Sequence, residues 1–117
     1  MFDMSGGGDM ARKKLETLSE QMYYVLLSLS DGPMHGYRMM QYVSELTQGR
    51  VVIGAGTLYA LLGRFEEEGY LRLSGIEEGR KSYELTPEGR RALEQEYDRL
   101  RRQVADGARF LGKGESI

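Results

Sequence analysis

The chain has 117 residues and a formal net charge of −2, with 40% apolar and 29% charged residues. This length fits one domain with a single small core, and the apolar share is too high for a disordered protein. Cysteine is absent and His35 is the single histidine, which excludes disulfides and thiolate metal sites and leaves few ligands for any other metal. No apolar run approaches the roughly 18 residues that cross a bilayer, and the amino terminus lacks the pattern of a secretion signal. We therefore expect a cytoplasmic protein with no metal, no cofactor and no membrane partner.

A first helix is predicted after an N-terminal tail. Residues 1–14 contain a glycine run and no apolar periodicity, so we expect a flexible tail there. Thr17 and Glu20 form a Thr-x-x-Glu capping box, which predicts that the helix starts at Thr17. The turn signal Asp31-Gly32-Pro33 ends the helix. The apolar residues that recur at helical spacing and predict one buried stripe are Leu18, Met22, Val25, Leu26 and Leu29.

The next segment predicts a second helix from about His35 to Leu46, ended by Gln48-Gly49. We expect the ring of His35 to cap or pack at the start of this helix. The side chains expected on its buried face are Met39, Val43 and Leu46. The β-branched run at 50–53 predicts a short additional strand.

A third helix is expected to start near Gly54–Gly56 and to end at Gly69, a natural left-handed cap. At about 100° per residue, its apolar face is predicted to hold Leu58, Leu61, Leu62 and Phe65. The opposite face is expected to hold Gly56, Ala60, Gly63, Arg64 and Glu67. Gly63 costs about 1 kcal/mol relative to alanine inside a helix, which favours a close approach by another molecule along this face.

The alternating segments 70–74 and 80–85 predict two half-buried strands, joined by a polar, glycine-bearing loop at 75–79. Thr86-Pro87-Glu88 then predicts a helix start, with a hydroxyl cap, proline in the first turn and an early acid. This last helix is expected over 87–112, followed by a flexible tail at 113–117. A narrow apolar seam at near-heptad spacing, after a domain that already has a core, predicts a homodimer interface. The seam consists of Leu93, Tyr97, Leu100, Val104, Ala108 and Leu111.

The predicted elements are mainly α with a small β wing, the arrangement of a winged helix-turn-helix domain over 15–86 followed by a C-terminal dimerisation helix. Five motifs occur in the order and spacing of a known family. They are Met34-His35-Gly36-Tyr37, Gly56-Thr57-Leu58-Tyr59, Glu67-Glu68-Gly69-Tyr70-Leu71, Gly79-Arg80-Lys81-Ser82-Tyr83 and Leu85-Thr86-Pro87-Glu88-Gly89-Arg90. Over roughly 18–111 the chain resembles the PadR family of bacterial transcriptional regulators, in the short form with one C-terminal helix.

This resemblance implies a homodimeric winged-helix repressor whose third helix enters the major groove and whose wing follows the flanking backbone or minor groove. It also implies release from DNA by a small molecule, often an aromatic one. The candidate effector pocket consists of Met22, Tyr23 and Tyr24, although a stripe of Met and Tyr is usually plain core. The positions that the resemblance assigns to DNA contact are Tyr37, Gly56, Thr57, Tyr59, Arg64, Arg80 and Lys81.

Several of these residues have a second interpretation. Thr57 is also suited to cap the third helix, and Tyr59 to pack in the core. Arg64 has glutamates within helical pairing distance. The wing cations Arg80 and Lys81 follow two glutamates, at 77 and 78, that are able to pair with them.

Two classes of function follow from these features. The first is a sequence-specific DNA-binding transcriptional regulator that binds a double-stranded operator as a homodimer, since a local basic cluster can oppose the sign of the total charge. The alternative is a winged-helix module for protein–protein association, which the acidic balance suits. An enzyme is not expected, because the chain has no cysteine, one histidine and no phosphate-binding glycine motif.

Overall fold

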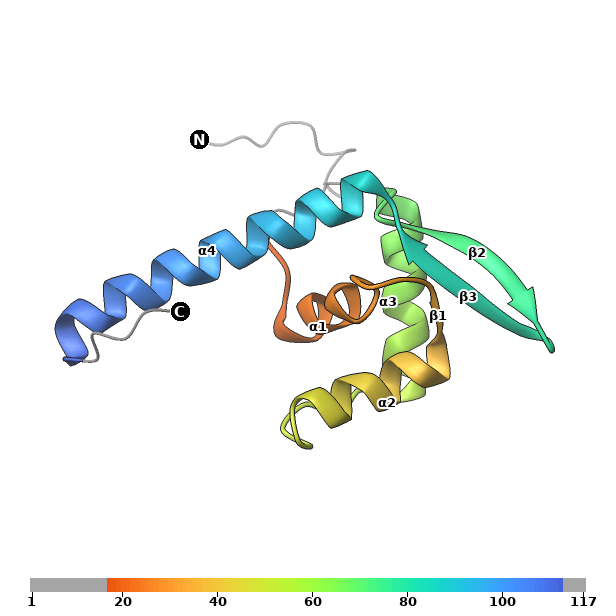
Figure 1. Cartoon of the computed structure of the whole chain (residues 1–117), viewed down its shortest axis with the longest axis horizontal. Coiled ribbons are helices and arrows are strands. Elements are labelled where there is room, and N and C mark those ends of the chain that lie inside the picture. The colour runs from red at the N-terminus through yellow and green to blue at the C-terminus, as the bar shows by residue number, and fades with distance from the viewer. Residues whose placement is uncertain (1–16, 113–117) are drawn as a thin grey trace, which may run out of the picture.

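The computed structural model describes residues 17–112. The elements in chain order are α1 (Glu20–Ser28), β1 (Met34–His35), α2 (Gly36–Leu46), α3 (Ala55–Glu68), β2 (Leu71–Glu77), β3 (Arg80–Leu85) and α4 (Pro87–Leu111). The first three helices form the body of the domain, from which the hairpin β2–β3 extends on one side and α4 on the other (Figure 1). The predicted winged-helix class with a long C-terminal helix is confirmed. The tails expected at 1–14 and 113–117 lie outside the described residues.

One core joins the helices to the sheet. Its fully buried centre comes from α1, α2 and α3, and the base of the hairpin and the first turns of α4 close it. Within residues 17–112 no helix is long and apolar enough to cross a membrane. The apolar side chains with at most 8% of their surface exposed include Val25, Leu26, Met39, Val43, Leu58, Leu62, Phe65, Leu71, Tyr83 and Leu93.

The start of α1 differs from the predicted capping box. The N-cap is Ser19, whose hydroxyl accepts a hydrogen bond from the amide of Met22 at 3.2 Å. Leu18 precedes the helix, and its amide donates to Glu96 Oε1 of α4 at 3.2 Å. The prediction for Thr17 was wrong because α4 satisfies the backbone just before the helix. Leu18 is still buried, as part of this lead-in segment.

The region around α2 contains two further corrections. Leu46 was predicted in the core but is 48% exposed, because the helix ends there and the chain turns away through positive φ values at Gln48 and Gly49. The strand predicted at 50–53 is absent. Its backbone is held instead by the Thr47 hydroxyl, which accepts from the amide of Val51 at 3.0 Å.

The third strand of the sheet is β1, which pairs antiparallel with β3 in the order β1-β3-β2. The hairpin is longer than predicted, since β2 runs through the expected loop to Glu77. A two-residue turn, Glu78-Gly79, has φ of 51° and 78°, as in the type I′ turns that suit the twist of a hairpin. A bulge between Leu73 and Gly75 shifts the register. Leu73 is 44% exposed, so the predicted half-burial of this strand holds only at its base.

The predicted caps at the end of α3 and at the start of α4 are both confirmed, and the structure joins them. Gly69 ends α3 with φ of 80°. The Thr86 hydroxyl accepts from the amide of Gly89 at 3.0 Å and donates to the carbonyl of Gly69 at 2.6 Å. Gly89 lies so close to Tyr70 that a Cβ would overlap its carbonyl oxygen. This contact fixes the first turn of α4 on the end of α3.

The predicted seam of α4 divides between two environments. Leu93 is 5% exposed and belongs to the core of its own domain, so it is not available to a partner. From residue 97 to residue 112 no side chain is buried. Tyr97, Val104 and Leu111 are 44%, 47% and 70% exposed, and Leu100 and Ala108 are half-buried.

Candidate nucleic-acid interface

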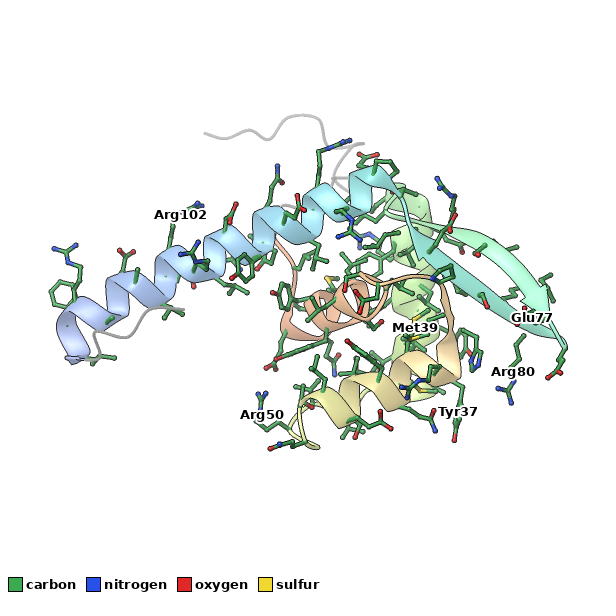
Figure 2. The ribbon with its side chains drawn as sticks, viewed as in Figure 1. Tyr37, Met39, Arg50, Glu77, Arg80 and Arg102 are labelled. Atoms are coloured by element: carbon green, nitrogen blue, oxygen red, sulfur yellow. The ribbon has the colours of Figure 1, made fainter. Side chains whose placement is uncertain are left out.

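A hollow of about 440 Å³ lies between the start of α2, the helix α3 and the tip of the wing. Four of the predicted DNA-contacting residues line it, and Figure 2 shows two of them, Tyr37 and Arg80, on the same side of the molecule. The full lining is His35, Gly36, Tyr37, Tyr59, Gly79, Arg80, Lys81 and Tyr83.

Strand pairing brings the start of α2 to the wing. His35 of β1 lies opposite Ser82 of β3, and its Nδ1 accepts a hydrogen bond from the amide of Arg38 at 3.2 Å, which confirms the predicted cap. Arg80 places its guanidinium 5.9 Å from the ring centroid of Tyr37 and its Nη1 3.4 Å from Nε2 of His35. A neutral imidazole has one acceptor nitrogen, and the cap uses it. The guanidinium of Arg80 therefore keeps its donors for another partner.

The two wing cations are free of carboxylates in the part of the chain that the structure describes. There the ion pairs join Arg38 to Glu45, Arg64 to Glu68, Arg72 to Glu84 and Arg99 to Glu96. Arg80 and Lys81 are exposed and take part in none of these pairs. The competition that the preceding glutamates were able to offer is not realised, and both cations are available to an anion.

The start of α3 is also available to an anion. Its N-cap is Gly54, which supplies no side-chain hydrogen bond, so Thr57 is not the cap. First-turn amides without side-chain partners, at the positive end of the helix dipole, favour anions. Gly56 and Thr57 are exposed, and a Cβ at Gly56 or Gly63 would meet no atom within 4 Å. The outward face of this half of α3 is small and unobstructed.

Tyr59 is 52% exposed and is therefore not a core residue. Its phenol lies against Gly36 at the start of α2, which the spacing of the sequence did not predict. Behind it, burial raises the pKa of the Tyr83 phenol, with smaller contributions from Glu66 and Tyr59. Tyr83 thus keeps its proton and adds no negative charge to the hollow.

Arg64 stands apart from this group. Its Nε lies 3.3 Å from Glu68 Oε2 on the next turn, and it does not line the hollow. The predicted contact residues thus divide into three sets: four side chains around the hollow, the open start of α3, and one paired arginine. His35, Gly36 and Tyr83 also line the hollow but were not among the predicted contacts, although the His-Gly-Tyr motif and the alternation of β3 include all three.

A second hollow, of about 330 Å³, is lined by residues of both α1 and α4. Tyr23 and Tyr24 line it with their rings edge to face at 5.7 Å, whereas Met22 does not line it and packs on the core. The carboxylate of Glu96 is buried at its base and is paired with Arg99. Burial raises the pKa of Tyr23, and Tyr97, Tyr24 and Glu96 add to this shift.

Residues 25–95 match the model of the transcriptional regulator PadR-like family. The transcriptional regulator YqjI of Escherichia coli K12 is 27% identical over 95 residues, which cover 81% of this chain and 46% of that protein. The chain spans less than half the length of the curated relatives it matches.

Solved structures share the fold. A PadR family regulator from Clostridium difficile R20291 is 24% identical, with a TM-score of 0.70 over 80% of this chain and 99% of that one. Bacillus subtilis PadR, whose structure contains operator DNA, is 23% identical, with a TM-score of 0.61 over 66% of this chain and 46% of that one. At these identities the likeness establishes the fold.

Proposed function

Because the chain belongs to the transcriptional regulator PadR-like family, we propose that it is a sequence-specific regulator that binds double-stranded operator DNA. The observation that carries this proposal is the hollow in which Tyr37, Tyr59, Arg80 and Lys81 converge beside the open start of α3. The complex of Bacillus subtilis PadR with operator DNA supports it. Membership in a family of regulators agrees with the expectation that the chain is not an enzyme.

In this proposal the first half of α3 enters the major groove. A groove about 12 Å wide admits a helix, and the small residues on this face allow the helix backbone to approach the bases. Thr57 and Gly56 lie at the edge that enters first. Arg64 can contact a base only if its ion pair with Glu68 breaks.

The hollow receives a phosphate of the DNA backbone. Arg80 and Lys81 supply charge, and the hydroxyl of Tyr59 supplies a neutral hydrogen bond. Contacts of this kind position the protein on the duplex and provide affinity without reading sequence. The wing and the start of α2 therefore anchor the complex, and α3 reads it.

The regulator acts as a homodimer through the second half of α4. Tyr97, Val104 and Leu111 of the seam are exposed in the single chain, and a second copy buries them. Two domains related by a two-fold axis bind half-sites about one helical turn apart. A net charge of −2 also favours binding through two anchors rather than one.

Repression relieved by a small aromatic effector is the regulatory part of the proposal. The hollow between α1 and α4 offers Tyr23 and Tyr24 for ring contacts and lies beside the seam of α4. A ligand there changes the packing of α4 on the domain and hence the spacing of the two reading helices. Tyr24→Ala is expected to remove release by such a ligand while leaving affinity for DNA unchanged in fluorescence anisotropy.

The primary test is selection of duplex fragments from the source genome by the purified protein. The selected duplex is then compared with a scrambled duplex of the same length and composition. We expect the selected duplex to bind at least about 10³-fold more tightly at physiological salt. Equal binding of both duplexes, or recovery of none, contradicts the proposal. The second of these outcomes is the one that a protein–protein module predicts.

A further inference from the structure

Gly36, the first residue of α2, packs so closely against the ring of Tyr59 that an added Cβ would displace the ring. A Cβ at this position would lie 2.6 Å from Oη, 2.9 Å from Cζ and 3.1 Å from Cε1 of Tyr59. The backbone of Gly36 does not have positive φ, so conformational freedom does not account for the glycine. The space that the missing side chain leaves is occupied by the phenol of Tyr59.

The segment that contains Gly36 touches both anchors of the proposed DNA site. His35 and Tyr37, on either side of it, contact the guanidinium of Arg80. Gly36 itself contacts Tyr59. Three consecutive residues thus lie against a wing cation and a phenol from α3.

This segment is itself fixed in place. Met34 and His35 pair with Tyr83 and Ser82 of β3, and the His35 ring caps α2. The segment therefore cannot shift to follow Tyr59, and the ring must move if the space at Gly36 is filled. Tyr59 is half exposed, so its ring can swing into solvent without opening the core.

We infer that Gly36 is a positioning residue, which seats the phenol of Tyr59 against α2 so that its hydroxyl faces the same phosphate as Arg80. The inference rests on the proposed binding of DNA and deepens it. A purely structural role for Gly36 predicts a loss of stability when it is substituted. A positioning role predicts a loss of DNA affinity that depends on Tyr59.

The test is a double-mutant cycle on the selected duplex, with wild type, Gly36→Ala, Tyr59→Ala and the double variant. Gly36→Ala is expected to weaken binding about threefold to tenfold, the loss of one hydrogen bond, and Tyr59→Ala by at least as much. The double variant is expected to match Tyr59→Ala alone. A Gly36→Ala variant that binds like wild type, or one that causes the same loss in the Tyr59→Ala background, overturns the inference.

Two further measurements distinguish a role of Gly36 in positioning Tyr59 from a role in the stability of the fold. Tyr59→Phe keeps the ring on Gly36 and removes the hydroxyl, so it is expected to lose affinity with an unchanged unfolding temperature. In spectra of the free protein, nuclear Overhauser contacts between the Tyr59 ring and the Gly36 α protons are expected in wild type. In Gly36→Ala, contacts from the Tyr59 ring to this position are expected to be lost, while the core methyl shifts stay unchanged. Retained ring contacts at this position in Gly36→Ala overturn the inference.

The outcomes also distinguish the inference from the function beneath it. A wild-type protein that binds no duplex overturns the proposed function, and the role of Gly36 with it. A wild-type protein that binds the selected duplex, with an additive cycle, overturns only the role of Gly36.

Discussion

The two halves of α4 belong to one continuous helix, but the first half is buried against the domain and the second half is exposed. The helix has 25 residues, about 37 Å of length at 1.5 Å per residue. Its first half, to Glu96, is built into the core, and in its second half no residue is buried. The contrast shows that one uninterrupted helix can complete a fold with its first turns and leave the rest exposed. The exposed part is the one that we propose as the dimer surface.

The first half is packed tightly against the domain. Gly89 lies against Tyr70, Leu93 fills the core, and Glu96 is 4% exposed. Glu96 accepts hydrogen bonds from the amide of Leu18 and from Arg99. The direction in which the second half leaves the domain is set by these turns.

The second half has exposed apolar side chains along one side and charged ones on the other. Val104 is 47% exposed on the seam, and Arg102 lies on the other side of the helix (Figure 2). An exposed apolar row on a stable helix is the pattern expected of a surface that meets a partner helix.

The largest expected effect comes from a charge on the seam. Val104→Glu is expected to give monomers, because two copies would bring like charges together in an apolar interface. Loss of the second anchor is expected to reduce affinity for the selected duplex by about 10² or more. Sedimentation equilibrium measures the first effect and fluorescence anisotropy the second. Gln95→Glu adds the same charge on the opposite side of the helix and is expected to remain dimeric; a dimeric Val104→Glu would contradict the seam.

A substitution in the first half is expected to act on folding. Gly89→Ala places a Cβ onto the carbonyl of Tyr70 and is expected to lower the free energy of unfolding by about 1–3 kcal/mol or more. Gly107→Ala, in the second half, meets no atom of its own chain within 4 Å and is expected to raise stability by about 0.5–1 kcal/mol. Urea unfolding measures both. Equal effects at the two glycines would remove the distinction between the halves.

The buried carboxylate of Glu96 gives a smaller effect. Glu96→Ala leaves the amide of Leu18 without its acceptor and is expected to cost about 1–3 kcal/mol. Glu94→Ala, at an exposed position two residues earlier, is expected to change stability by less than about 0.5 kcal/mol. Thermal unfolding of the two variants compares them directly, and a neutral Glu96→Ala would show that the lead-in segment is not held by α4.

The smallest effect is a loss of folding stability at alkaline pH, caused by Tyr23 where α1 meets α4. Burial raises the folded-state pKa of Tyr23 above the ordinary value of about 10 for a tyrosine. The folded state therefore holds this proton more tightly, and the stabilisation is complete below about pH 10 and lost as pH rises from there through the folded pKa. Tyr23→Phe is expected to unfold with a shallower loss of stability between pH 9 and pH 11. An identical pH profile would show that Tyr23 is not protected by α4.

Local patterns predicted the elements whose signals are contained within one segment. The cap at Gly69 and the Thr86 start of α4 involve residues a few positions apart. The apolar face of α3 follows from spacing alone. The wing cations Arg80 and Lys81 were placed by their position in a hairpin, and the structure keeps them free of carboxylates within the described residues.

The errors at Leu46 and at 50–53 arise locally, where α2 ends and the Thr47 hydroxyl binds the backbone of Val51. The other errors involve partners distant in sequence. The choice of Ser19 over Thr17 as the N-cap depends on Glu96, 78 positions beyond Leu18. The two-residue strand β1 is too short to show periodicity and exists because β3 pairs with it. The assignment of Leu93 to the core depends on where the body of the domain meets α4, and the contact of Gly36 with Tyr59 joins two helices. Spacing within a segment carries no information on such contacts.

The most direct test of DNA binding by the wing and the start of α2 is the salt dependence of affinity for the selected duplex. Arg80→Ala with Lys81→Ala is expected to reduce the slope of log affinity against log salt by about 0.9 for each lost phosphate contact, hence by nearly 2. Arg102→Ala with Arg109→Ala removes the same charge from the outer half of α4 and is expected to leave the slope unchanged. A slope unaffected by loss of Arg80 and Lys81, or reduced equally by the control, would contradict the assignment of the DNA site.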